Sequence, residues 1–283
     1  KTNSTLIILF LAPLIRPEGV LIVAIVTGWL TYESRNISAT AQLTIKLFLL
    51  WAPIIISLRY FYGYWLPNTF YAKSGAGLSN LGQGIQYLWL FSSYYFPITI
   101  LLVLSFTMKW KALGKAAFPL ASIFLLWLSQ VTMQGGDNMV GFRAFLAILP
   151  LAYLTITYAF RHTQEKYFFT IATAIILYLF YSYNYGTVVA SAWNIPVKDH
   201  ASGWRSSFIE RKDTGIWLKE NFPQNTTTAL SAAGITPYFS GQPTIDMLGL
   251  NNTYIALHGK RDRSIVYGHQ AGDGEFVMRS APD

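Results

Sequence analysis

The sequence predicts an α-helical polytopic membrane protein that ends in a small extracytoplasmic α/β domain. The first observation is composition: 53% of the 283 residues are hydrophobic and 12% are charged, about half of the 25% that is usual in soluble domains. The second is distribution, because the N-terminal two thirds is mostly apolar and the last third holds most of the acidic residues. We therefore expect a transmembrane region over residues 1–186 and an α/β domain over residues 187–283.

Hydrophobic segments account for most of the first region. A membrane-spanning helix needs about 20 apolar residues, and about seven segments approach that length. The clearest are Tyr87–Thr107, Ala116–Met133, Ala144–Phe160 and Tyr167–Tyr185, with a shorter one at Leu43–Leu58. Another apolar run, over residues 4–31, is cut by Arg16-Pro17-Glu18-Gly19. These residues would be costly inside a lipid-exposed helix, so we expect two helices that meet at a surface corner.

The basic residues predict the orientation of these segments. Alternate loops on one side carry about eight Lys and Arg residues and those on the other side about four, which places the richer side in the cytoplasm. The Arg161 loop is then inside and the Arg59 loop outside. Seven segments place the chain after about residue 186 outside the cytoplasm. The chain has no cysteine, which excludes disulfides and thiolate metal sites.

The C-terminal region has the alternating pattern of a small α/β fold. Ser206–Asn221 has a helical pattern followed by Pro223, and Asn251–His258 is a second candidate helix. Thr226–Ser231 and Pro243–Asp246 are short candidate strands, so we expect a small parallel sheet. His258 and His269 stand near several Asp residues, but their spacing matches no compact zinc signature. No metal site is therefore predicted.

The most informative segment is the loop from Arg59 to Lys73, which holds two cations, five Tyr and Trp rings, Gly63 and Pro67. Its simplest interpretation is an interfacial aromatic belt with flanking cations. The alternative is a substrate loop at the water–lipid boundary, where rings stack on sugars and cations hold phosphate. In that interpretation Arg59 and Lys73 bind the phosphate. The candidates for sugar or lipid contact are Tyr62, Tyr64, Trp65 and Asn68.

Two further outer loops carry charged residues. Gly135 and Gly136 allow close backbone approach, and Asp137 and Arg143 are spaced to form an ion pair. This loop is either a turn held by a structural salt bridge or a third phosphate contact through Arg143, with Asp137 as a supporting residue that positions Arg143 or a substrate hydroxyl. Arg16 and Glu18 are either an architectural corner or supporting residues of the same cavity. Successive loops that each supply an Arg suit a phosphate-directed pocket.

These residues resemble a bacterial branch of the GT-C superfamily of polytopic glycosyltransferases, and the branch is similar to the terminal arabinofuranosyltransferases of the mycobacterial cell wall. The resemblance covers almost the whole chain. The most specific segment is Arg59, Tyr62-Gly63, Leu66-Pro67-Asn68-Thr69 and Ala72-Lys73. Supporting segments are Arg16-Pro17-Glu18-Gly19, Gly135-Gly136-Asp137 with Arg143, Asp246 with Gly249-Leu250, and Gly268-His269 with Pro282-Asp283.

The resemblance implies a GT-C-like fold in a bacterial inner (plasma) membrane and a glycosyltransferase activity. The donor would be a polyprenyl-phosphate sugar and the acceptor an extracytoplasmic cell-envelope glycan; the lipid bilayer is the third partner, and no nucleic acid is expected. Relatives carry a catalytic carboxylate in their first large outer loop. No segment here matches that loop, so the general base is expected upstream of Lys1. No cofactor is implied beyond a possible divalent cation.

Two other functions remain compatible with the residues. A lipid-linked glycan polymerase or ligase also uses Arg-rich outer loops on a multispan frame, but it takes a lipid diphosphate donor. A transporter or flippase would place broken helices and charges at mid-membrane. The predicted spans after Tyr87 hold almost no charges, which makes a transporter the weaker alternative.

Overall fold

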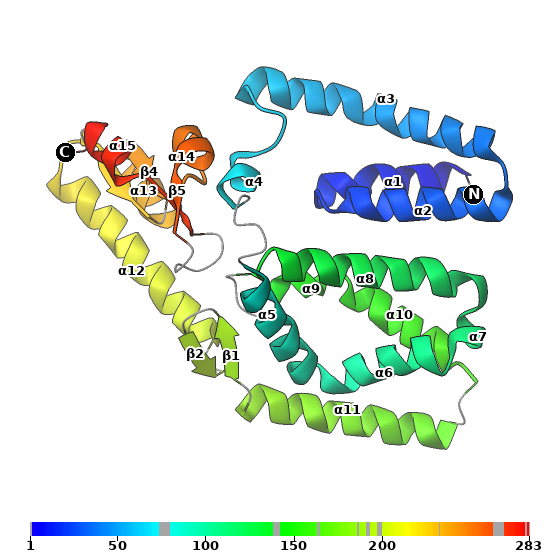
Figure 1. The fold of residues 1–283 in the computed structure, drawn as a ribbon. Coiled ribbons are helices and arrows are strands. Elements are labelled where there is room, and N and C mark those ends of the chain that lie inside the picture. The colour runs from blue at the N-terminus through cyan, green and yellow to red at the C-terminus, as the bar shows by residue number, and fades with distance from the viewer. Residues whose placement is uncertain are drawn as a thin grey trace. The chain divides into compact units, whose positions relative to one another are not determined.

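The computed structural model describes most of the chain and is mainly helical (Figure 1). The described residues are 2–73, 80–137, 142–162, 165–185, 187–190, 193–196, 200–231, 233–262, 269–280 and 282. The chain forms two compact units. The first consists of residues 1–66, 101–129 and 150–162, and the second of residues 67–100, 130–149 and 163–283. The predicted boundary of the membrane region near residue 186 stays a prediction, because compactness does not show which residues lie in lipid.

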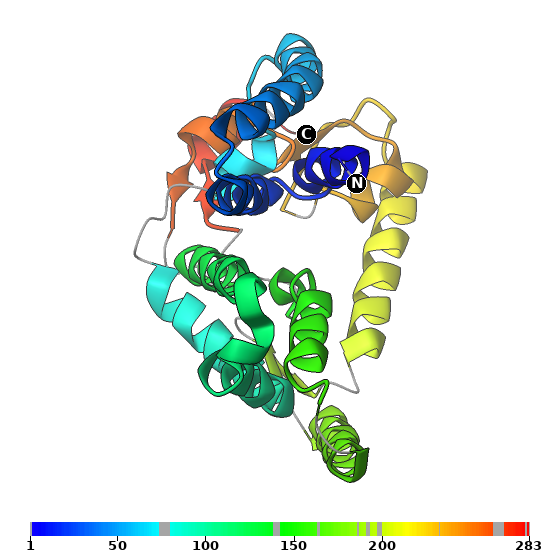
Figure 2. The same cartoon turned by 90° about the vertical axis from the view of Figure 1, so that its right-hand side faces the viewer.

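Three N-terminal helices pack together in the first unit: α1 (Thr2–Ile15), α2 (Gly19–Ser34) and α3 (Ile37–Tyr62) (Figures 1 and 2). Leu9, Val23 and Leu47 form their buried core. The predicted helix break at residues 16–18 is confirmed. Gly19 is required there, because a Cβ atom would lie 2.3 Å from the Ala12 carbonyl oxygen.

The rest of the first unit is built from segments of four helical elements. These are part of α6 (Phe96–Thr107), α7 (Trp110–Leu113) with the short turn η2 (Gly114–Ala116), most of α8 (Ala117–Met133) and most of α10 (Leu149–Ala159). Leu113, Ala117 and Ala159 form a second buried cluster, against which Phe106 and Phe160 pack.

By length and composition, two helical stretches in the described part of the chain are suited to crossing a membrane. They are Ile37–Tyr62 and Trp110–Met133. A third is added if α5 (Leu81–Tyr94) and α6 are counted as one span, although they meet at an angle of 97°. The other apolar helices are shorter: Ser4–Ile15, Gly19–Ser34, Leu149–Ala159 and Phe169–Asn184.

The segment Tyr87–Thr107, expected as one membrane span, is formed by two helices that meet at a bend. The chain bends between Tyr94 and Phe96, and Pro97 lies in the first turn of α6. Proline lacks the N–H that a continuous helix would need and is favoured in a first helical turn. Pro150 has the same position in α10, which shortens the helix expected over Ala144–Phe160.

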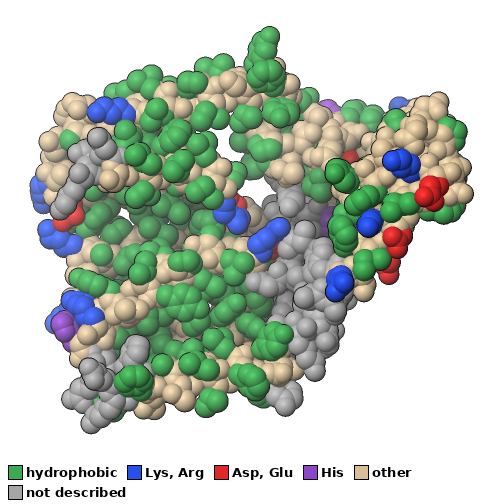
Figure 3. Space-filling model, turned by 180° about the vertical axis from the view of Figure 1, so that it is seen from behind, with side chains coloured by type: hydrophobic (Ala, Val, Ile, Leu, Met, Phe, Trp, Pro, Cys, Tyr) green, Lys and Arg blue, Asp and Glu red, His purple; other side chains and the backbone are tan. Residues whose placement is uncertain are grey.

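The apolar surface of the helices supports a membrane protein. Only 6% of the most hydrophobic 18-residue stretch of α3 is buried. The exposed side chains of this helix include Ile45, Phe48 and Leu49. Figure 3 shows apolar side chains spread over much of one face. Soluble monomers rarely expose continuous apolar surface on this scale. The hydrophobic composition and the exposed apolar surface of the helices therefore both favour a membrane protein.

The second unit contains the remaining elements before the α/β region. They are α4 (Asn68–Lys73), α5, α9 (Arg143–Leu146), α11 (Glu165–Tyr185) and the antiparallel strands β1 (Thr187–Ala190) and β2 (Trp193–Pro196). The sequence pattern did not predict the β1–β2 pair.

The C-terminal α/β region follows the predicted order. Its long helix is α12 (His200–Asn221), shown in yellow in Figure 2. The remaining elements are β3 (Thr228–Leu230), α13 (Ile235–Ser240), β4 (Thr244–Asp246), α14 (Thr253–His258), β5 (Lys260–Arg261), β6 (Ala271–Gly272) and α15 (Gly274–Arg279). Strands β3 and β4 are parallel, with Thr228 opposite Thr244. The predicted parallel pair and both predicted helices are confirmed.

A close helix contact and a buried core hold this region together. A Cβ atom at Gly215 in α12 would lie 2.6 Å from the Thr236 carbonyl oxygen in α13, so the glycine lets the two backbones meet. The Thr236 hydroxyl also donates to the Arg211 carbonyl at 3.1 Å. Ile255, Ala271 and Val277 form a buried core, against which Ala229 of β3 and Ile245 of β4 pack.

Candidate functional site

The first half of the aromatic loop is shaped by the end of α3. Gly63 ends the helix in the left-handed conformation, with φ of 76°, and the Arg59 guanidinium donates to the Gly63 carbonyl. The guanidinium carbon also lies 5.7 Å from the centre of the Trp65 ring, within cation–π range. Arg59 is therefore held by its own turn. Around it Tyr60, Phe61, Tyr62 and Trp65 are exposed, whereas Tyr64 is half-buried.

The second half of the loop forms α4, which is joined to the α/β region. Asn68 Nδ2 donates to Thr253 Oγ1 of α14 at 2.9 Å, and Ala72 is buried. Asn68, predicted as a sugar or lipid contact, thus has a structural partner. Lys73 is the last residue of α4. Its side chain, a predicted phosphate ligand, lies outside what the structure describes.

A second link to α4 comes from an arginine that the sequence did not single out. Arg261 Nη2 donates to the Tyr71 carbonyl at 2.9 Å and to the Ala256 carbonyl at 2.7 Å, and Nη1 donates to the Gly259 carbonyl at 3.0 Å. Burial lowers the pKa of the Arg261 guanidinium. One cation therefore binds α4, α14 and the turn after α14 through their backbone oxygens.

Asp137 and Arg143 form the predicted ion pair. Arg143 Nε lies 2.8 Å from Asp137 Oδ2, and Nη2 lies 2.9 Å from Oδ1, which is the bidentate geometry that arginine favours with a carboxylate. The Asp137 side chain is 9% exposed and that of Arg143 is 49% exposed. The carboxylate is thus largely enclosed, while half of the arginine surface is open. This geometry fits both the structural and the phosphate-binding interpretation.

The two glycines before Asp137 make the predicted close approach. Gly135 and Gly136 have φ of 88° and 87°. A Cβ atom at Gly135 would lie 2.9 Å from Asn80 Cβ, and one at Gly136 would lie 2.5 Å from Tyr87 Cγ. The glycines therefore allow the turn to pack directly on α5 and the residue before it.

A ring cluster that the sequence did not reveal supports the Arg143 end of this loop. Tyr87 and Phe91 of α5 pack against Phe142 and Phe145, and the Tyr87 and Phe145 rings are stacked with centroids 5.4 Å apart. Phe145 is fully buried. Arg143 stands between these two phenylalanines, so its backbone is fixed by the core of the second unit.

Arg16 and Glu18 contact each other at the corner between α1 and α2. Arg16 Nη2 lies 3.3 Å from Glu18 Oε1, and the Arg16 guanidinium carbon lies 5.5 Å from the Trp127 ring centre. These contacts connect the corner to α8, as expected of an architectural role. Arg16 and Arg59 belong to the first unit and Arg143 to the second. The convergence of these arginines on one phosphate stays a prediction.

The α/β region contains a cavity of about 350 Å³ that sequence reasoning missed. It opens where the parallel strands end: Ser231 follows β3, and Met247 and Leu248 follow β4. Ligands of open α/β sheets commonly bind outside the carboxyl ends of the strands. The charged and imidazole side chains on its lining are Lys260, Arg261, Asp262, His269 and Asp273.

Asp246 shapes the turn beside this cavity. The carboxylate is buried and accepts from Leu248 N at 2.9 Å and from Asn251 N at 2.6 Å. Gly249 follows with φ of 76°. The motif quoted for the family resemblance therefore has a structural role here. Within the described residues, no group of three His, Asp or Glu side chains is arranged to hold a metal ion.

Comparison with known proteins identifies only the C-terminal region. Residues 201–282 match a family described as a domain of unknown function (DUF8728). This stretch contains α12 to α15 and every residue that lines the cavity beside β3 and β4. No curated protein and no solved structure matches the chain.

Proposed function

We propose that the protein is a membrane glycosyltransferase of the GT-C type. It transfers a sugar from a polyprenyl-phosphate donor to a cell-envelope glycan on the outer side of a bacterial plasma membrane. The observation that carries the proposal is the end of α3. A helix long and apolar enough to cross a membrane carries Arg59 in its last turn, and the Arg59 guanidinium is held against Trp65 among exposed rings. A fixed cation beside aromatic faces suits a sugar joined to a lipid phosphate.

The reaction is a displacement at the anomeric carbon. The bond from that carbon to the phosphate oxygen breaks, the acceptor oxygen forms the new glycosidic bond, and a carboxylate takes the acceptor proton. The lipid phosphate leaves with additional negative charge, which fixed cations stabilise. Arg59, Lys73 and Arg143 are assigned to that role, and the general base is not assigned to a residue of this chain.

The α/β region is assigned to the acceptor. Its cavity lies at the carboxyl ends of parallel strands and carries both acidic and basic side chains, which suit the many hydroxyl groups of a glycan. The hydrogen bond from Asn68 to Thr253 and the contact from Arg261 to Tyr71 join this region to the second half of the aromatic loop. Donor and acceptor elements are therefore connected through α4.

The test is sugar transfer by the intact protein from a polyprenyl-phosphate donor. Arg59→Ala is expected to lower turnover about a hundredfold, the usual effect of removing one preorganised charge-stabilising donor. Lys46→Ala is the matched control, because Lys46 is an exposed cation on the same helix, and it should leave turnover unchanged.

Two results would contradict the proposal. One is equal turnover of Arg59→Ala and the unaltered protein, with both folded and inserted in membranes. The other is a requirement for a lipid diphosphate donor, which would instead indicate a glycan polymerase or ligase.

A further inference from the structure

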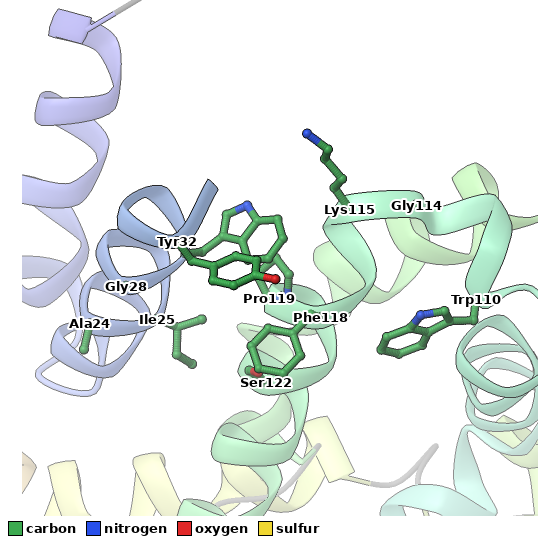
Figure 4. A pocket seen from close by; sticks show the side chains of 11 residues that line it. Ala24, Ile25, Gly28, Tyr32, Trp110, Gly114, Lys115, Phe118, Pro119 and Ser122 are labelled. Atoms are coloured by element: carbon green, nitrogen blue, oxygen red, sulfur yellow. The ribbon is translucent and has the colours of Figure 1, made fainter. Parts of the chain in front are cut away.

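A groove of about 660 Å³ lies between α2 and the α7–α8 segment of the first unit (Figure 4). This volume is within the range of about 300–1,000 Å³ typical of small-molecule sites. Ile25, Trp29 and Tyr32 line it from α2, and Trp110 and Phe118 line it from the other side. From Ala24 to Tyr32 the groove follows eight residues of helix, about 12 Å. Its walls are thus apolar and elongated.

The aromatic residues of the groove are those that favour a membrane surface. The Trp29 ring centre lies 5.6 Å from Tyr32 and 6.3 Å from Phe118. Trp and Tyr are enriched where the hydrocarbon of a bilayer meets its headgroups. The groove also lies near the end of α2, which stops at Ser34, and near the start of α8 at Ala117. The rim of the groove therefore suits a position at the level of the lipid headgroups.

The rim carries an excess of positive charge. Lys115 lines the groove and points away from the rings in Figure 4. Its ammonium lies 3.0 Å from Glu33 Oε1, yet the Lys115 side chain is 80% exposed. Lys111 is exposed on α7, and Arg161 donates to the Ala112 carbonyl of that helix at 2.9 Å. The segment just before α8 therefore holds Lys111 and the contact of Arg161, and its Lys115 lines the groove.

The groove contains open space next to Gly28 of α2. A Cβ atom added at Gly28 would meet no other atom within 4 Å. Gly28 also lines the groove, so the α2 backbone is accessible there. The absence of a side chain at this position leaves room for an apolar ligand, and a larger residue would occupy the same room without a clash.

We propose that this groove binds an anionic phospholipid, with one acyl chain along the apolar walls and the headgroup against Lys115. Burial of the chain supplies the apolar part of the affinity, and the basic rim selects a negatively charged headgroup. The site is separate from the proposed donor site: Arg16 precedes the opposite end of α2, and Arg59 lies at the far end of α3 from the α2–α3 connection. The proposal therefore does not depend on the proposed function.

The experiment measures lipid retention by the full chain in the absence of any sugar donor. The purified protein is reconstituted with phosphatidylglycerol or phosphatidylcholine, and bound lipid is counted by native mass spectrometry. We expect preferential retention of phosphatidylglycerol. Lys115→Glu should lower that preference at least fivefold, since one Lys near an anionic lipid surface contributes about that factor. Lys46→Glu, an exposed charge reversal on α3, should not.

A second variant tests the apolar part of the site. Gly28→Leu should lower retention of both phospholipids by filling the groove. Gly82→Leu is its control, because Gly82 is also helical and also has no atom within 4 Å of an added Cβ. Equal retention of the two lipids, no effect of Lys115→Glu, or displacement of phosphatidylglycerol by equimolar undecaprenyl phosphate would each overturn the proposal. Lys115 is exposed, so its variant remains informative even if Gly28→Leu fails to fold.

Discussion

The side-chain amide of Asn68 donates a 2.9 Å hydrogen bond to the hydroxyl of Thr253, 185 positions later in the chain. Thr253 is the first residue of α14, and Asn252 caps that helix by accepting from Ile255 N at 3.1 Å. The partner of Asn68 is thus held rigidly. The segment that follows the exposed rings is therefore part of the same packed structure as the C-terminal region.

The Asn68–Thr253 contact should appear as a coupling energy. Asn68→Ala and Thr253→Val should each destabilise the second unit by about 1 kcal/mol, the usual net contribution of one hydrogen bond. The double variant should cost less than the sum of the two. Denaturant unfolding of the intact protein, analysed as a double-mutant cycle, measures this coupling. Strict additivity would show that the two side chains do not interact in solution.

Arg261 should be far more sensitive than its neighbour Lys260. Arg261→Ala leaves the carbonyls of Tyr71, Ala256 and Gly259 without their charged donor, and we expect a loss of about 3 kcal/mol. Lys260 is exposed, so Lys260→Ala should change stability by less than about 0.5 kcal/mol. Hydrogen exchange should show faster exchange of the α4 and α14 amides in the Arg261 variant alone.

Two glycines of α12 should respond in opposite directions to the same substitution. Gly215→Ala places a Cβ atom 2.6 Å from the Thr236 carbonyl oxygen, so it should destabilise the α12–α13 contact by about 1–3 kcal/mol. Gly203→Ala meets no atom within 4 Å and should stabilise the helix by up to about 1 kcal/mol. Thermal unfolding of the two full-length variants provides the measurement. A similar change in both would contradict the close approach.

The Asp137–Arg143 pair should depend on its bidentate geometry. Arg143→Ala leaves a largely enclosed carboxylate without its partner, and we expect a loss of about 1–2 kcal/mol, since half of the arginine is solvent-exposed. Arg143→Lys keeps the charge but not the two parallel hydrogen bonds.

The two Arg143 variants separate the two interpretations of this loop. Arg143→Lys should recover only part of the stability that Arg143→Ala loses, because lysine cannot make the two parallel hydrogen bonds. It should lower sugar transfer by more than this loss of stability explains if Arg143 also holds phosphate. Unfolding and transfer assays on the same preparations decide between these outcomes.

Elements with strong local signals were predictable from the sequence. The break between α1 and α2 follows from the charged and helix-breaking residues at 16–19, and β3, β4 and α14 follow from their local composition. The bend within Tyr87–Thr107 was not expected, because the apolar pattern continues through it, whereas Pro97 favours the start of a new helix. The β5–β6 pair has only two residues in each strand, too few to produce an alternating pattern.

The candidate site was predictable only where its residues are close in sequence. Asp137 and Arg143 are six positions apart and follow two glycines, so their pairing was expected. Thr253 lies 185 positions from Asn68, and Tyr71 lies 190 positions from Arg261. No local pattern encodes such distant contacts. The cavity beside β3 and β4 likewise depends on the parallel register, which brings Ser231 and Met247 to one edge.

The attachment of α4 to α14 has a consequence for the entropy of folding. Pro67 immediately precedes α4, and Asn68, the first residue of that helix, donates to Thr253. The proline ring fixes φ at Pro67, so this segment has fewer conformations to lose when the second unit folds. Docking of α4 on the C-terminal region therefore costs less entropy than docking of an unconstrained segment of the same length.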